Sequence, residues 1–318
     1  MVQVTISASG RKISLATDLP VVLDIPAGLD SATVGDVKAA FAAKYPKASA
    51  HSRFYVSRQK LTLKDEKKAL ADDTTLQNAG LVDGGVLQIK DLGPQISWRT
   101  VFIVEYVGPL IIHPLMYHFP KVFYGGSVQH SLLQHYVYAM VMLHFLKREF
   151  ETVFVHRFSH GTMPFAYIFR NSAHYHLLGG LGLAYAVYSP TYSSSSPYIR
   201  GTIRDDPKFL WACTAIWLFC ELSNLKTHVI LRNLRPVGTK KRAIPYGYGF
   251  NLVSTPNYFF EIMGWIVVCL MTGSYASWVF TATGIYFMGT WAMKKHRNYK
   301  KEFGKEYPRR KIMIPFIF

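Results

Sequence analysis

The sequence predicts a small mixed α/β domain over residues 1–92, followed by an all-α polytopic membrane bundle over residues 97–318. Residues 1–92 have the composition of a water-soluble domain, whereas the rest of the chain holds long apolar runs rich in Phe, Tyr, Trp and Gly. The formal net charge of +17 comes largely from basic residues beside those runs. This pattern favours a membrane surface and phosphate-bearing ligands over nucleic acid.

The N-terminal domain is expected to contain strands, one helix and then further strands. MVQVTISA and KISLATD predict two strands joined by a turn at Ser9 and Gly10. The segment TVGDVKAAFAAKYPK predicts an amphipathic helix that is capped by Thr33. SRFYVS with KLTL, and then GGVLQIK, supply the later strands.

The apolar runs predict six transmembrane helices, near 97–117, 128–146, 174–190, 208–224, 258–273 and 276–293. Six crossings place the basic loop 225–257 and the basic tail on the same side as the N-terminal domain. The positive-inside rule makes that side cytosolic. Residues 161–172 are expected to be re-entrant, interfacial or a seventh crossing, and the closing IPFIF is expected to pack back on the bundle.

Four polar side chains recur along NLKTHVILRNLRP. Spacings of four, four and three place Asn224, His228, Arg232 and Arg235 within roughly 80° of one another on a helix. Such a stripe suits a polyanion such as a pyrophosphate, and it equally suits a basic helix that touches lipid headgroups.

The segment YGYGFNLVSTPNYFFE places polar residues at the start of an apolar helix. Asn257 and Glu261 are four residues apart and therefore share a face, and Tyr258 lies beside it. A glutamate one turn inside an apolar run is costly unless it is paired or functional. The alternative is a capped helix start with an interfacial tyrosine.

Charge and imidazole are concentrated in HFLKREFETVFVHRFSHGTMP, directly after an apolar run. Lys147 and Glu151 are four residues apart, and His156 and His160 have the spacing of a metal-binding pair. Membrane di-iron enzymes need several such boxes with adjacent histidines, and this chain has no His-His pair, so no metal site is predicted. GGLGLA lies inside an apolar run and predicts helix packing, not a Rossmann nucleotide site.

Several of these segments, in order, resemble the steroid 5α-reductase family, and most closely its very-long-chain trans-2-enoyl-CoA reductase branch. The resemblance rests on HFLKREFETVFVHRFSHGTMP, NLKTHVILRNLRP, YGYGFNLVSTPNYFFE and EYPRRKIMIPFIF. The helix start TVGDVK and LADDTTLQNAGLVDGG resemble a ubiquitin-like β-grasp domain, which accompanies the enzymes of that branch. The fold expected from the resemblance is therefore a ubiquitin-like α+β domain followed by a helical membrane domain.

The resemblance implies NADPH-dependent reduction of the trans-2 double bond of long-chain enoyl-CoA, the last step of the fatty-acid elongation cycle. It implies a multi-pass protein of the endoplasmic reticulum membrane with both termini in the cytosol. The lipid bilayer and other enzymes of the elongation cycle are the expected partners.

The resemblance also implies the residues of the site. Lys147 and Tyr258 match residues regarded as essential in the enoyl-CoA branch, with Tyr258 expected to protonate Cα. Lys147 is expected to be its electrostatic partner, or a contact of a phosphate or an oxyanion. His228 stands where the steroid enzymes carry Asp, and the tail aligns only across a one-residue gap. The implied cofactor-binding residues are Asn224, His228, Arg232, Arg235, Asn257, Glu261, Arg297 and Tyr299.

Three other functions remain open from the sequence. A sterol or polyprenol double-bond reductase is the nearest within the same family. An isoprenylcysteine-type methyltransferase shares helical architecture and a basic C-terminal half, and a non-catalytic membrane scaffold would present the ubiquitin-like domain. That domain and the NYFFE segment favour the acyl-CoA branch.

Overall fold

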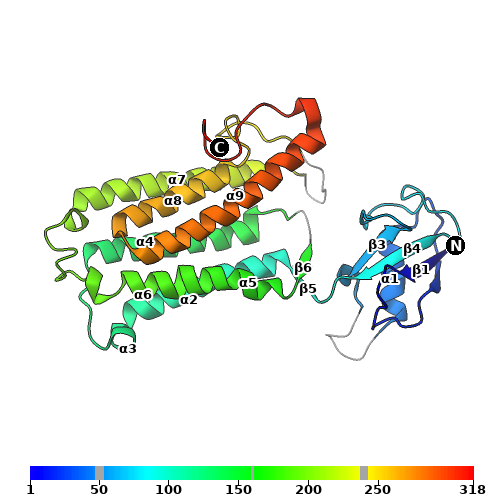
Figure 1. The fold of residues 1–318 in the computed structure, drawn as a ribbon, viewed down its shortest axis with the longest axis horizontal. Coiled ribbons are helices and arrows are strands. Elements are labelled where there is room, and N and C mark those ends of the chain that lie inside the picture. The colour runs from blue at the N-terminus through cyan, green and yellow to red at the C-terminus, as the bar shows by residue number, and fades with distance from the viewer. Residues whose placement is uncertain (47–53, 159–160, 237–242) are drawn as a thin grey trace. The chain divides into compact units, whose positions relative to one another are not determined.

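The computed structural model describes residues 1–46, 54–158, 161–236 and 243–318, which form two compact units (Figure 1). The first unit runs from Met1 to Trp98 and also includes the described residues 161–167. The second unit holds the remaining described residues.

The first unit is built on a four-stranded sheet in the order β2-β1-β4-β3, with β1 antiparallel to β2 and parallel to β4. Alternate residues of the strands are buried, and this inner face encloses an apolar core with helix α1. The mixed α/β domain expected from the sequence is confirmed. Its elements are β1 (Val2–Ala8), β2 (Val21–Ile25), α1 (Val34–Lys44), β3 (Gln59–Leu63) and β4 (Val86–Asp91).

Two of the predicted strands are wrong. KISLATD forms only an isolated bridge between Ile13 and Ala16, and the second strand is instead the later VVLDI of β2. Two residues that are three apart in one strand point to opposite faces of a sheet. Ile13 and Ala16 are nevertheless both buried, because the chain turns between them. In SRFYVS, Val56–Arg58 forms a 3₁₀ turn, and Ser52 and Arg53 lie outside the described residues.

Thr33 caps α1, as the sequence predicts. Its hydroxyl accepts a hydrogen bond of 3.2 Å from the backbone N–H of Asp36, whose carboxylate accepts one of 2.8 Å from the N–H of Thr33. The backbone N–H and the hydroxyl of Thr33 both donate to that carboxylate, and these two bonds lower the pKa of Asp36. The reciprocal pair satisfies two backbone donors that the helix leaves open.

Replacing Thr33 with alanine is expected to destabilise the first unit by about 1 kcal/mol, because the cap is lost. Hydrogen–deuterium exchange of the intact protein measures this effect. The amides of α1 should exchange faster in Thr33→Ala than in wild type, and Thr33→Ser should remain close to wild type. Equal exchange in all three proteins would contradict the role of the cap.

The second unit is a helical bundle whose long helices lie where the sequence predicts apolar runs. Helices α7, α8 and α9 pack consecutively against one another, and α4 packs against α7 (Figure 1). The long elements are α2 (Trp98–His118), α4 (Leu132–Phe150), η3 (His174–Gly182) continued by α6 (Leu183–Val187), α7 (Pro207–Asn233), α8 (Pro256–Thr272) and α9 (Tyr275–Phe303).

Among the described residues, α2 alone combines the length and the apolar composition needed to cross a bilayer. Helix α8 is apolar but has 17 residues. The six predicted crossings are therefore not confirmed, although helices form at all six positions.

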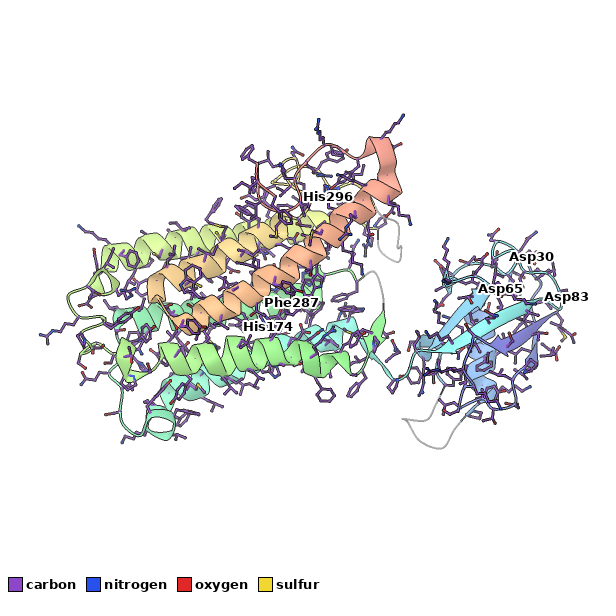
Figure 2. All side chains as sticks on the ribbon, viewed as in Figure 1. Asp30, Asp65, Asp83, His174, Phe287 and His296 are labelled. Atoms are coloured by element: carbon purple, nitrogen blue, oxygen red, sulfur yellow. The ribbon has the colours of Figure 1, made fainter. Side chains whose placement is uncertain are left out.

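Residues 161–172 do not form a separate span where they are described. Strand β6 (Thr162–Pro164) pairs antiparallel with β5 (Gln95–Ser97). Helix α5 (Tyr167–Ala173) then runs directly into the π-helical η3. The second half of the segment is therefore the beginning of the helix that was predicted to start at residue 174. Within this helix η3 packs against α9, with the rings of His174 and Phe287 6.1 Å apart (Figure 2).

The C-terminal tail packs back on the bundle, as expected. The hydroxyl of Ser254 lies 2.7 Å from that of Tyr307 and 2.6 Å from Nδ1 of His296, which fastens the tail to α9. The backbone of Met313 donates a hydrogen bond to the carbonyl of Phe318, and both residues join an apolar cluster that includes Tyr258. The tail therefore closes the bundle beside the first turn of α8.

Candidate active site

A network of charged and polar side chains joins α4, α7 and α8 inside the second unit. On each helix these side chains recur at spacings of three or four residues, so they share one face. A π-helical turn, η2 (Glu151–Val155), extends the face of α4 by one carboxylate. The network consists of His144, Lys147, Arg148, Glu151, Glu221, Asn224, His228, Asn257 and Glu261.

Lys147 is bound between two helices. Its Nζ donates a hydrogen bond of 2.6 Å to Oδ1 of Asn224 and lies 2.8 Å from Oε2 of Glu221. It is also 3.6 Å from Oε1 of Glu151. The other oxygen of Glu221 lies 2.8 Å from Nδ1 of His144. Two carboxylates therefore surround the ammonium group of Lys147, which fixes it against α7.

Asn224 connects Lys147 to the third helix. Its Nδ2 donates to the backbone carbonyl of Asn257 at 2.8 Å and to Oε2 of Glu261 at 3.0 Å. Asn257 is itself buried, and among the described residues its Oδ1 has no hydrogen-bond partner. A buried acceptor of this kind is costly unless a ligand or a water molecule satisfies it.

Glu151 is fully buried and lies at the centre of a second group of charged side chains in the network. It lies 2.6 Å from Nη1 of Arg148 and 3.0 Å from Nδ1 of His228. Burial acts to raise its pKa, but the charges of Arg148, His228 and Lys147 hold that pKa well below the usual range. The second guanidinium nitrogen of Arg148 donates to the hydroxyl of Tyr106 at 2.9 Å, which links α2 to the network.

Three potential metal ligands meet beside Arg148. Glu151, His156 and His228 each bring one ligand atom within 4.8 Å of the others. Arg148 and Lys147 already neutralise this carboxylate, so the donor set does not fit a divalent cation. Burial, followed by the charge of Arg148, lowers the pKa of His156 to about 2, and this imidazole is therefore neutral. His160 lies outside the described residues.

Tyr258 points away from Lys147. It follows Asn257 on α8 but faces α9, where its ring lies 6.5 Å from that of Trp291. Nζ of Lys295 lies 4.6 Å from the centre of the same ring. In the part of the chain that the structure describes, Lys147 and Tyr258 make no direct interaction. Lys295, and not Lys147, is the lysine beside this tyrosine.

The remaining predicted cofactor residues lie outside the network. Arg235 donates a hydrogen bond of 3.0 Å to the carbonyl of Arg157 and so ties the end of α7 to the segment after η2. Arg232 and Arg297 are exposed, and Tyr299 stacks on Tyr307 with ring centres 5.4 Å apart. The structure thus brings together Lys147, Asn224, His228, Asn257 and Glu261, and leaves Arg232, Arg297 and Tyr299 apart from them.

Sequence reasoning missed four members of this region. Glu221 lies three residues before Asn224, so extending the polar stripe backwards along α7 would have found it. His144 and Arg148 are on the same face of α4 as Lys147. Lys295 is one of several basic residues in its segment, and nothing in the local pattern separates it from Lys294.

Comparisons with known proteins bear on both units. A family model described as 3-oxo-5-alpha-steroid 4-dehydrogenase matches residues 161–318. One described as TECR, ubiquitin-like domain, matches residues 28–91. A putative enoyl reductase of Schizosaccharomyces pombe is 46% identical over 99% of both chains. Very-long-chain enoyl-CoA reductase of Dictyostelium discoideum is 39% identical over 90% of this chain and 92% of its own. A probable very-long-chain enoyl-CoA reductase of Caenorhabditis elegans is 39% identical over 82% and 85%.

Proposed function

Because the chain belongs to the very-long-chain enoyl-CoA reductase family, we propose that it reduces the trans-2 double bond of long-chain enoyl-CoA, with NADPH as the hydride donor. The observation that carries this proposal is the buried polar network of α4, α7 and α8, which leaves the acceptor of Asn257 open. Burying each of these charges costs desolvation free energy, which pairing only partly offsets. A scaffold without a catalytic site does not require such a network.

The residues present fit a nicotinamide nucleotide. The open Oδ1 of Asn257 complements the amide N–H groups of a carboxamide, and Asn224 and Glu261 hold the surrounding backbone and side chains in place. Arg232 is exposed one turn beyond the network, where a guanidinium suits the phosphates of the same ligand. NADPH, when bound, supplies a hydride to Cβ of the enoyl thioester.

The chain's own groups then handle charge and protons. Negative charge develops on the thioester oxygen as Cβ is reduced, and donors aimed at that oxygen stabilise it. Tyr258 carries the hydroxyl that we assign as the proton donor to Cα. We assign Lys147 as a positioning residue, because it holds Asn224 and thereby supports the α7–α8 contact on which Asn257 depends.

We place this reaction in the endoplasmic reticulum membrane as the last step of the fatty-acid elongation cycle, next to the enzymes that form the enoyl thioester. The apolar helix α2 supports a membrane location. Both termini, and with them the ubiquitin-like domain, would then lie in the cytosol, where the nucleotide and the CoA group are available.

Purified intact protein in detergent tests this function. NADPH should be oxidised in the presence of a long-chain trans-2-enoyl-CoA, faster than NADH and faster than with an enone steroid. Turnover of the steroid alone would favour a sterol reductase. Binding of S-adenosylmethionine without NADPH binding would favour the methyltransferase, and absence of any turnover or nucleotide binding would favour the scaffold.

Replacing Asn257 with alanine is expected to raise the Kd for NADPH about tenfold, because about 1.4 kcal/mol of hydrogen bonding to the ligand is lost. The backbone carbonyl that accepts from Asn224 remains. Asn251→Ala is the matched control, because among the described residues that side chain accepts a hydrogen bond only from the N–H of Gly247, in an exposed turn. Quenching of protein fluorescence by NADPH reports both affinities, and equal Kd values would remove Asn257 from the cofactor site.

A further inference from the structure

One face of α9 meets the first turn of α8 at Tyr258. Trp291 and Lys295 are four residues apart on this face, so both are directed at the same neighbour. The ring of Trp291 lies 6.5 Å from that of Tyr258, and Nζ of Lys295 lies 4.6 Å from the centre of the tyrosine ring. Trp291 and Lys295 therefore both lie against the ring of Tyr258 from α9.

Lys147 and Lys295 differ in what surrounds their ammonium groups. Lys147 has the carboxylate of Glu221 at 2.8 Å and that of Glu151 at 3.6 Å, which neutralise its charge. Lys295 forms no ion pair with a carboxylate among the described residues, and its electrostatic neighbours include Tyr258. Its charge is therefore free to act on that phenol, whereas the charge of Lys147 is not.

Other titratable groups also face Lys295. Tyr299 interacts with it from the next turn of α9, and Arg235 from the end of α7. His156 faces it from the segment that follows η2 and is neutral. Because Arg235 is also positive, the phenolate of Tyr258 would be the anion that balances this group of cations.

We propose that Lys295, and not Lys147, is the electrostatic partner of Tyr258 in the reduction, an inference that rests on the proposed function. When Cβ has received a hydride, the O–H bond of Tyr258 breaks and a C–H bond forms at Cα. The electron pair of the broken bond stays on the phenol oxygen as a phenolate. The ammonium group of Lys295 stabilises that phenolate until a water molecule returns the proton.

Four variants of the intact protein test this role: Lys295→Met, Lys295→Arg, Lys294→Met and Tyr258→Phe. Lys294→Met is the matched control, because this lysine is exposed like Lys295 and adjacent to it in sequence but points in another direction on the helix. We expect Lys295→Met to lower kcat for a long trans-2-enoyl-CoA by roughly tenfold to a hundredfold. Arginine keeps the charge, so Lys295→Arg should retain most of the activity.

Two further readouts separate this role from a structural one. The Kd for NADPH, measured by fluorescence without substrate, should be unchanged in Lys295→Met, as should the apparent melting temperature.

The outcomes also separate this inference from the proposed function. Wild-type protein without enoyl-CoA turnover would contradict the function itself. An active wild type with an equally active Lys295→Met variant would overturn the inference alone. A raised Kd for NADPH with unchanged kcat would also overturn it, because Lys295 would then bind the cofactor and not support Tyr258.

Discussion

Replacing Tyr258 with phenylalanine is expected to lower kcat by about a hundredfold or more, because positioned proton transfer contributes on that scale. The substitution keeps the ring that contacts Trp291 and Lys295 and removes only the hydroxyl. Binding of NADPH should therefore stay close to that of wild type. Turnover of a long trans-2-enoyl-CoA by purified protein, followed through NADPH oxidation, measures the loss.

Tyr275→Phe is the matched control for that experiment. Tyr275 is 84% exposed at the beginning of α9, so removing its hydroxyl should leave kcat unchanged. If Tyr258→Phe keeps wild-type turnover, Tyr258 is not the proton donor, and another group must protonate Cα.

Replacing Glu151 with glutamine is expected to destabilise the second unit by about 3 kcal/mol, the scale on which a broken buried ion pair destabilises a protein. Glu151 is fully buried between Arg148 and His228, and glutamine keeps its size while removing the negative charge. The cations around it would then lack their counter-ion. The apparent melting temperature in detergent, followed by intrinsic fluorescence, should fall by several degrees.

Glu149→Gln is the control for Glu151, because this glutamate is two residues earlier and only partly buried. Equal melting temperatures for the two variants would contradict the central position of Glu151. The pH dependence has a defined sign. Because the folded protein holds the pKa of Glu151 below its usual range, its stabilisation is present above that range and is lost only as pH falls through the depressed value.

Periodicity and caps located the main elements of both units. The alternation in GGVLQIK and the cap at Thr33 identified β4 and α1, and the apolar runs identified the long helices. The strand expected in KISLATD failed because its apolar residues serve a buried turn and not one face of a sheet. Apolar content alone also could not decide whether a helix crosses a bilayer, since α8 is apolar but short.

The site was partly predictable for a physical reason. Spacing along one helix identifies side chains that share a face. It correctly placed Asn224 on the same face as His228, and Asn257 on the same face as Glu261. Which helices then meet is decided by tertiary packing, which no local pattern contains. Tertiary packing also decides that Tyr258 lies against α9. Tyr258 and Asn257 are adjacent in sequence, yet they contact different helices.

In the proposed reduction, hydride from a nicotinamide reaches Cβ of an enoyl thioester while a protein group delivers a proton to Cα. Incubation of the intact protein with a long trans-2-enoyl-CoA and NADPH deuterated at the transferable position tests it directly, with the product analysed by mass spectrometry. We expect one deuterium at Cβ from the cofactor and, in a parallel reaction in heavy water with unlabelled NADPH, one deuterium at Cα from solvent. Product without label from the cofactor, or with solvent deuterium at both carbons, would contradict it.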